Sequence, residues 1–465
     1  MTKPVLLLLR RDLRLHDNPA LVAAGQTGQP VLPVYIYEEN IRQPGGASKW
    51  WLHNSLAALQ TDWHARTGGH VRVESGRAAD VLPRLVAETG ATAVFWNRRY
   101  APYEIEIDKT LKAALPQAQS SKGNLLFEPW EVQNGSGGWY KVFTPFWKAA
   151  MAQQATITNV QPVPDKLVAY TGAEHLTLAD LDLLPRKPNW AAGWDKLWQP
   201  GEAGAQARLQ SFLQDGIQGY KTLRNRPDLL HTSRLSPHLA FGEISPREIY
   251  QQARAWQAAH PDYEKDAEHF ISEIGWREFS YNLLYHMDDI AHEPLQPQFK
   301  DFPWEDHPAW LTAWQNGQTG YPIVDAAMRE LWQTGWMHNR CRMVVGSFLV
   351  KNMLTHWHHG EAWFWDTLVD ADVANNSASW QWISGCGADA APYFRIFNPI
   401  TQGEKFDPDG TYVRHWVPEL KDVPLAYLHK PWEMPVPPVT YPAPLMAHST
   451  ARQKALEAYE TIKKS

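Results

Sequence analysis

The sequence predicts an α/β domain followed by an all-helical domain, and three observations lead to this fold class. Short apolar, β-rich runs alternate with helical patterns over residues 1–132. From residue 199 onward the strand signal nearly disappears, and apolar residues recur at helical spacing. Residues 133–198 are rich in Gly, Pro, Asn and Trp and have weak periodicity. We therefore expect domains over 1–132 and 199–465, joined by a connector over 133–198 that lies on the surface.

The first domain is expected to hold a parallel sheet with helices on both faces. The runs PVLLLLR, VLPVYIY, HVRVESG and TAVFWNRRY indicate buried strands, and NPALVAAG, SLAALQTDW and AADVLPRLVAE indicate the helices between them. Asn18 followed by Pro19 is typical of a helix start. Neither GxGxxG nor a P-loop follows the first strand, so these two routes of nucleotide binding are not predicted.

Composition narrows the class of protein. A formal charge of −6 argues against a surface covered by nucleic acid but leaves room for one local basic groove. Two cysteines without CxxC spacing predict no disulfide framework and suit a reducing compartment, so we expect the cytoplasm. No apolar stretch is long enough to predict a membrane span.

One helical pattern in the second half carries unusual chemistry on a single face. Within EIGWREFS, a carboxylate, an indole, a cation and a hydroxyl fall at i, i+3, i+4 and i+7. These residues are Glu273, Trp276, Arg277 and Ser280. A solvated surface is the simplest interpretation of such a face, but a tryptophan there favours a ligand that stacks on it.

Two further segments have competing explanations. TSRLSPHLAFGEISP, over 232–246, offers hydroxyls beside Arg234 and a capping box at Ser245, which suit phosphate but which helix capping alone also explains. HWHHG, over 356–360, gives no helical or strand face with three converging ligands, so we predict no metal site.

These segments, together with RRDLRLHDNPAL, HNRCRM (338–343), DADVANN (370–376), WQW (380–382) and APYFRIFNP, closely resemble the photolyase/cryptochrome family. The resemblance covers almost the whole chain in the family's order and spacing, and it is strongest to bacterial cyclobutane pyrimidine dimer photolyases. It implies light-driven repair of such dimers by an electron from FADH⁻, with UV-damaged DNA as the partner. It also implies a monomer in the bacterial cytoplasm.

The resemblance assigns residues to the FAD site. The pyrophosphate and ribitol are expected at one tyrosine and a short segment, and the flavin ring beside a buried ion pair of Arg342 with Asp370. The full set implied to bind the cofactor is Tyr220, Thr232, Ser233, Arg234, Leu235, Ser236, Arg342, Asp370, Asp372 and Asn376. Asn376 matches the residue that faces flavin N5, and an amide there fits fully reduced FADH⁻.

The resemblance also assigns the residues that meet damaged DNA. A dimer flipped out of the duplex is expected to pack on Trp276 and to bond to Glu273, because a cofactor cannot reach a base step inside the stack. The implied lesion and DNA contacts are Arg224, Glu273, Trp276, Arg277, Ser280, Asn339, Arg340, Met343 and Trp382. Asn339 and Met343 occupy the positions of two histidines in (6-4) photolyases and cannot donate the proton that (6-4) repair requires, which favours the cyclobutane dimer.

Trp380, Trp357 and Trp304 match the three tryptophans that carry electrons to FAD during photoreduction, although core packing alone would also explain each. Glu104 lines up with a carboxylate that contacts methenyltetrahydrofolate, the second chromophore of some relatives, and 8-hydroxy-5-deazaflavin is the alternative antenna. The functional alternatives are a signalling cryptochrome, a (6-4) photolyase and, more remotely, a dark flavin oxidoreductase or a DNA-binding module.

Overall fold

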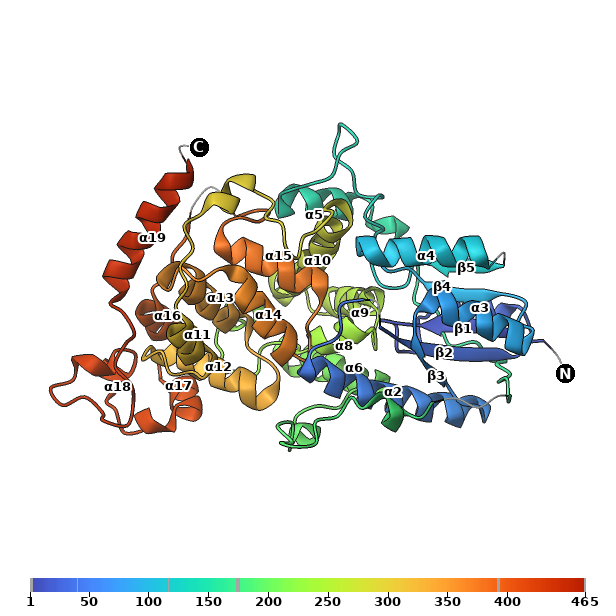
Figure 1. Cartoon of the computed structure of the whole chain (residues 1–465), viewed down its shortest axis with the longest axis horizontal. Coiled ribbons are helices and arrows are strands. Elements are labelled where there is room, and N and C mark those ends of the chain that lie inside the picture. Colours follow the sequence, from blue (N-terminus) through green and yellow to red (C-terminus); the bar gives the residue numbers. More distant parts are fainter. Residues whose placement is uncertain (1–2, 40, 116, 173–175, 391–393, 464–465) are drawn as a thin grey trace. The chain divides into compact units, whose positions relative to one another are not determined.

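The computed structural model describes residues 3–39, 41–115, 117–172, 176–390 and 394–463 (Figure 1). Its strands are β1 (Val5–Leu9), β2 (Val31–Glu38), β3 (Arg72–Gly76), β4 (Val94–Asn97) and β5 (Ala118–Ser121). The helices up to residue 286 are α1 (Pro19–Gln26), α2 (Gly46–Thr67), α3 (Ala78–Thr89), α4 (Pro102–Ala114), α5 (Phe143–Ala152), α6 (Glu202–Ser211), α7 (Tyr220–Leu223), α8 (Ser236–Phe241), α9 (Pro246–Ala259) and α10 (Glu264–His286).

The later helices follow without a further strand in the described part of the chain. They are α11 (Pro308–Gln315), α12 (Pro322–Thr334), α13 (Asn339–Ser347), α14 (Trp357–Thr367), α15 (Val373–Ser384), α16 (Pro399–Phe406), α17 (Thr411–Trp416), α18 (Leu425–Leu428) and α19 (His448–Lys463). Two short π-helices, η4 (Phe212–Gly216) and η7 (Phe348–Asn352), continue α6 and α13.

The chain forms two compact units. The first comprises residues 1–218, 233–288 and 369–371, and the second comprises 219–232, 289–368 and 372–465. The sequence-based boundaries after residues 132 and 198 stay a prediction. α5 lies within the segment that we expected to be a connector.

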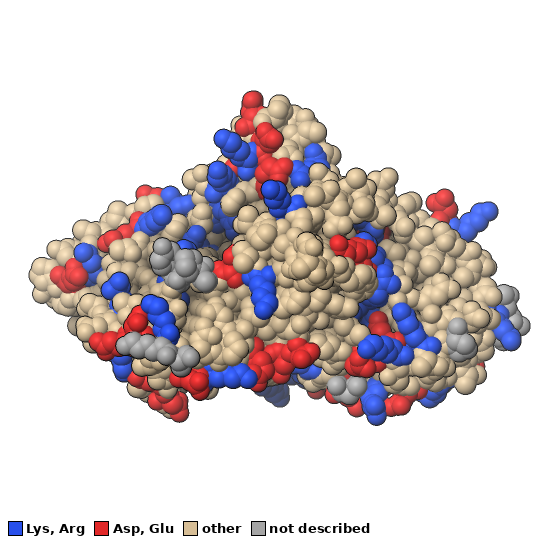
Figure 2. Space-filling view, turned by 90° about the horizontal axis from the view of Figure 1, so that it is seen from above, with Lys and Arg blue, Asp and Glu red and all other residues tan. Residues whose placement is uncertain are grey.

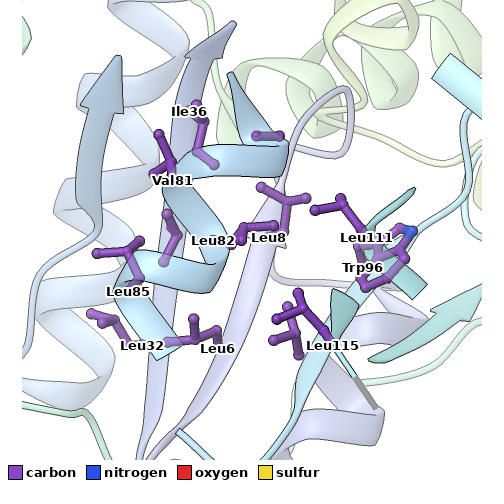
Figure 3. Packing of buried hydrophobic residues seen from close by; sticks show 13 residues of the cluster. Leu6, Leu8, Leu32, Ile36, Val81, Leu82, Leu85, Trp96, Leu111 and Leu115 are labelled. Carbon is purple, nitrogen blue, oxygen red and sulfur yellow. The ribbon is translucent and has the colours of Figure 1, made fainter. Parts of the chain in front are cut away.

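The first unit contains the predicted parallel sheet, in the order β3-β2-β1-β4-β5. The order reverses between β1 and β4, so right-handed crossovers put α3 and α4 on the face opposite α1. Leu6, Leu8 and Trp96 lie beneath Leu82 of α3 and Leu111 of α4, all with 1% or less of their surface exposed (Figure 3). These continuous apolar strands are buried on both faces, which explains why they lack polar alternation.

The loop after β1 joins the sheet to the helices of the same unit. Arg14 donates to the carbonyl of Gly242 at 2.9 Å, and Asp17 accepts from Nε of Arg247 at 2.9 Å. Gly242 has a φ of +67°, and a Cβ there would lie 2.0 Å from the carbonyl oxygen of Arg11. RRDLRLHDN and TSRLSPHLAFGEISP therefore lie against each other, which requires glycine at position 242.

Helix starts follow the expected local chemistry. The Asn18 side chain accepts from the backbone N–H of Leu21 at 3.2 Å, and the Ser245 hydroxyl accepts from that of Glu248 at 3.0 Å. Each satisfies an amide that has no partner within its helix.

Candidate flavin and DNA sites

In the first unit, the indole of Trp276 on α10 stacks on Phe143 at the start of α5. The two ring centroids are 3.8 Å apart, and the ring planes differ by 10°. One face of the indole is therefore covered by Phe143. Trp276 and Glu273 are half-buried, whereas Ser280 is 8% exposed and donates to the Trp276 carbonyl at 3.0 Å.

Arg277 and Glu278, which follow Trp276 on α10, bind the segment that follows β5. Arg277, 9% exposed, donates to the carbonyl of Asn124 at 2.8 Å, and its guanidinium lies 4.7 Å from the ring centroid of Tyr281. The Glu278 carboxylate accepts from the backbone amides of Leu126 at 2.9 Å and Phe127 at 3.1 Å. The cation that we expected on a ligand-facing surface is thus largely engaged by the protein, and its contact with DNA stays a prediction.

The predicted phosphate segment has a strained turn. Arg234 adopts a φ of +52°, which is unusual for a residue with a side chain, and the Ser233 hydroxyl accepts from the amide of Leu235 at 3.4 Å. Ser236 is exposed and donates its hydroxyl proton to Asp370 at 2.6 Å. The structure thus brings Ser236 and Asp370 together, two residues that the sequence assigned to the same cofactor.

In the second unit, Asn376 of α15 is fixed by α14. Its amide nitrogen donates to the backbone carbonyl of Glu361 at 3.0 Å and to the carboxylate of the same residue at 2.9 Å. Both N–H groups are then occupied, and the amide oxygen is the atom that can accept a hydrogen bond from a ligand. Asp372 caps the same helix by accepting from the amide of Asn375 at 2.8 Å.

Three arginines form a local positive cluster in the second unit. Burial, together with the cations Arg224 and Arg395, lowers the pKa of Arg340. Arg340 donates to Asn225 at 2.7 Å, and the Arg224 guanidinium lies 5.4 Å from the ring centroid of Tyr220. Positive charges held close together favour an anionic ligand. Figure 2 shows basic and acidic side chains interspersed over the face it displays.

The remaining predicted residues of α13 lie near this cluster in sequence. Arg342 donates through Nε to the Met337 carbonyl at 2.8 Å, and Asn339 is exposed. Met343 is half-buried, as is Trp382 on α15. Arg342 and Asp370 belong to different compact units, so their ion pair stays a prediction. Thr232 is half-buried and belongs to the second unit, as does Tyr220.

The three tryptophans of the predicted electron route all belong to the second unit. Trp357 and Trp380 are 2% and 3% exposed, and Trp304 is half-buried. The indole N–H groups of Trp304 and Trp380 are buried without a hydrogen-bond partner in the described structure. Trp380 packs against Phe364, with ring centroids 5.0 Å apart.

The predicted antenna residue is engaged within the first unit. Glu104, 7% exposed, accepts from the Ala101 amide at 3.2 Å and lies 3.4 Å from Nε of Arg99. A cavity of about 370 Å³ lies between α3 and α4, beside the neighbouring residue Tyr103. Its lining consists of Arg77, Ala78, Ala79, Tyr103, Glu106, Ile107 and Thr110.

Sequence reasoning missed Glu361 and Phe143. A carboxylate inside the aromatic run HWHHGEAWFWD was a usable signal, because a buried acid needs a partner. Phe143 had no signal, since nothing in its spacing pairs it with Trp276.

Within the described ranges, no three His, Cys, Asp or Glu side chains are grouped so as to hold a metal ion. A search of the same ranges finds no helix long and apolar enough to span a membrane.

Two family models match this chain. The model described as DNA photolyase matches residues 5–166, and the model described as FAD binding domain of DNA photolyase matches residues 270–461. A relative named deoxyribodipyrimidine photo-lyase, from Agrobacterium fabrum, is 46% identical over 100% of this chain and 99% of its own length. Cryptochrome-2 of Arabidopsis thaliana is 36% identical over 98% of this chain and 79% of its own length.

A solved structure supports the same relationship. The crystal structure of a bacterial class III photolyase from Agrobacterium tumefaciens superposes with a TM-score of 0.95 at 46% identity, covering 100% of this chain and 98% of that one.

Proposed function

This chain belongs to the DNA photolyase family, and on that premise we propose that it repairs cyclobutane pyrimidine dimers in DNA with light. The family resemblance, the fold class and an enzyme of the photo-lyase type, all predicted from the sequence, are confirmed. The more specific proposal rests on the two hydrogen bonds that the side-chain amide of Asn376 donates to Glu361.

The residues present fit FAD. Its binding domain in this family matches residues 270–461. The Ser233 hydroxyl, which accepts from the Leu235 amide, keeps its hydrogen for a phosphate, and the Asn376 oxygen offers an acceptor for a ring N–H. When bound and fully reduced, FAD supplies on absorbing light the electron that opens the dimer, and it takes the electron back afterwards.

Asn376 favours the reduced cofactor through hydrogen bonding. With both amide hydrogens donated to Glu361, its oxygen can only accept, so it stabilises a protonated flavin N5 and supplies no proton itself. Tyr220, Thr232, Arg234, Leu235, Arg342, Asp370 and Asp372 complete the proposed cofactor contacts.

The proposed lesion contacts suit a reaction that needs no proton donor. Trp276, with one face covered by Phe143, stacks the flipped pyrimidines on its other face, and Glu273 accepts from them. Asn339 and Met343 have no acidic proton to give, which supports cyclobutane repair over (6-4) repair. Catalysis by these residues is positioning.

The arginine cluster is proposed to bind phosphates beside the lesion. Arg224 and Arg340 repel each other in the free protein, and a phosphate relieves that repulsion. Arg277, Ser280 and Trp382 are the other proposed DNA contacts. UV-damaged DNA is accordingly the proposed partner, bound by a monomer in the cytoplasm. Both cysteines, Cys341 and Cys386, are free, which suits that reducing compartment.

Trp380, Trp357 and Trp304 are proposed to conduct electrons inward from the protein surface to reduce the flavin. Their burial, which keeps Trp357 and Trp380 almost dry, supports this role. For the antenna we propose methenyltetrahydrofolate near Glu104, with 8-hydroxy-5-deazaflavin as the alternative. The open hollow beside Tyr103 lies next to this residue in sequence, and Glu104 itself does not line it.

The second candidate is a blue-light receptor. The 36% identity to Cryptochrome-2 favours it, and the two candidates differ in whether bound flavin repairs DNA.

The experiment is a repair assay on an oligonucleotide with one cyclobutane thymine dimer, under blue light, with a dark control and a (6-4) control. Loss of the cyclobutane dimer alone, in the light alone, is the expected result. Bound flavin without repair supports the receptor instead. Repair in the dark contradicts both candidates.

A further inference from the structure

The segment His356–Gly360, which spells HWHHG, begins α14 and touches each tryptophan of the proposed electron route. Trp357 belongs to the segment, and its two ends face the other tryptophans: His356 contacts Trp304, and Gly360 contacts Trp380. The inference drawn below rests on the proposed function, because it concerns that route.

At one end of the segment, the His356 ring contacts two indoles. Its centroid lies 5.0 Å from that of Trp304, with ring planes 60° apart, and 5.8 Å from that of Trp357, with planes 25° apart. The ring cannot turn freely, because His356 is the N-cap of α14 and its Nδ1 accepts from the backbone N–H of His358 at 3.2 Å. Helix capping thus fixes the imidazole that touches both indoles.

The capping hydrogen bond also determines which ring nitrogen of neutral His356 carries the proton. Since Nδ1 accepts a hydrogen bond, the neutral ring carries its proton on Nε2. Burial, then the neighbours His358 and His359 on the same helix, lowers the pKa of His356 to about 4. The imidazole is therefore uncharged at neutral pH, and it does not repel positive charge on an adjacent indole.

At the other end of the segment, the Trp380 ring packs directly against Gly360. A Cβ on Gly360 would lie 2.1 Å from Cη2 of Trp380, so the indole rests directly on the backbone of α14. A Cβ on Gly346 of α13 would meet the same indole only at 3.7 Å, an ordinary contact, and its closest approach would be 3.2 Å to the Ile383 side chain. Any side chain at position 360 must move Trp380.

We propose that two residues of this segment position the electron route: His356 fixes Trp304 and Trp357, and Gly360 fixes Trp380. In one pass along this route, Trp380 would give one electron to the flavin, Trp357 would refill Trp380, and Trp304 would refill Trp357. A thiol in solution would return one electron to Trp304, becoming a thiyl radical and releasing its proton to water. Two passes, with one proton taken up from water, would convert oxidised FAD to FADH⁻, while no covalent bond in the protein changes and neutral His356 exchanges no proton.

Two variants with matched controls test the proposal. His356→Asn keeps a side chain able to cap the helix but removes the ring, and His359→Asn is its control, since His359 is exposed on the same turn. Gly360→Ala is compared with Gly346→Ala. Each protein is labelled with 5-fluorotryptophan, loaded with FAD and kept in the dark for ¹⁹F NMR. The signals are assigned with Trp→Phe variants.

The expected spectra differ by position. His356→Asn moves the Trp304 and Trp357 signals, Gly360→Ala moves the Trp380 signal, and the controls move neither set. Photoreduction with a thiol then slows about tenfold or more in both test variants, because small displacements of reacting groups are costly. Unmoved signals with wild-type photoreduction in both variants overturn the proposal.

Trp357→Phe separates this proposal from the function on which it rests. Normal photoreduction in Trp357→Phe shows that the electron route itself is wrong. Slow photoreduction in Trp357→Phe, together with normal rates in His356→Asn and Gly360→Ala, overturns only the positioning role. If Gly360→Ala does not retain FAD, the double variant with Trp380→Phe is made, because the smaller ring relieves the contact with the new Cβ. Recovered FAD binding in the double variant supports the role of Gly360. No recovery counts against that role.

Discussion

Asn376 donates both of its side-chain amide hydrogens to Glu361, one to the backbone carbonyl and one to the carboxylate. This pair joins α14 to α15 and sets which atom of Asn376 faces a ligand. The orientation is therefore a property of the protein before any cofactor binds.

Replacing Asn376 with Asp is expected to destabilise the FAD-loaded protein at neutral pH. The new carboxylate would face that of Glu361 at about the present 2.9 Å and could donate nothing to it. Loss of these donors should cost roughly 1–3 kcal/mol, measured by thermal unfolding and by retained FAD. Glu361→Gln in the same chain supplies a donor again and should recover part of the loss. Equal stability of Asn376→Asp and the wild type would contradict the described pairing.

Trp276→Ala is expected to weaken binding of dimer-containing DNA while FAD is retained. Base stacking on an aromatic ring is worth about 1–3 kcal/mol, so affinity should fall about 5-fold to 150-fold, measured by fluorescence anisotropy. Trp256→Ala is the matched control, since that indole stacks on His260 elsewhere in the first unit. Unchanged affinity for the lesion in Trp276→Ala would remove the stacking role.

The sequence predicted elements that depend on local pattern. The strands β1 and β2 follow uninterrupted apolar runs, and Asn18 caps the helix that its neighbour Pro19 begins. Beyond residue 199, where the sequence gives almost no strand signal, the described structure consists of helices and the loops between them. In each case burial and capping are decided within a few residues of the chain.

What the sequence could not predict depends on contacts between distant segments. Gly242 is required because its backbone lies against Arg11, 231 positions earlier, and no local spacing records that contact. The hydrogen bond from Asn376 to Glu361 likewise joins two helices, α15 and α14. The π-helix η7 inserts a residue into an otherwise regular helical pattern, and packing around it, not periodicity, selects it.

Arg340→Gln is expected to weaken DNA binding and reduce its salt dependence. If Arg340 neutralises one phosphate, the slope of log K against log salt should fall by about one unit, and undamaged DNA should be affected as well. Binding is measured over a range of salt concentrations. Arg452→Gln, an exposed arginine on α19, controls for the change in net charge. An unchanged slope for Arg340→Gln would place the phosphate contacts elsewhere.

Glu278 should make the protein less stable as the pH rises. Burial raises the pKa of its carboxyl to about 7, against the opposing effects of Arg277 and the amides of Phe127 and Leu126. The folded protein therefore holds a proton that the unfolded chain releases near its usual pKa of about 4.3, so stability is full below that pH and falls until about pH 7.

Glu278→Gln tests this directly, because its amide oxygen can accept from the same two backbone amides without carrying a charge. Relative to wild type, the variant should gain roughly 2–4 kcal/mol between about pH 4.5 and about pH 8, since each unit of pKa shift is worth about 1.4 kcal/mol. Urea unfolding of the FAD-loaded protein at several pH values measures the difference. Glu268→Gln, which changes an exposed carboxylate on the same helix, should give no such trend. A constant difference between Glu278→Gln and wild type over this range would mean that Arg277 keeps Glu278 ionised in the folded state.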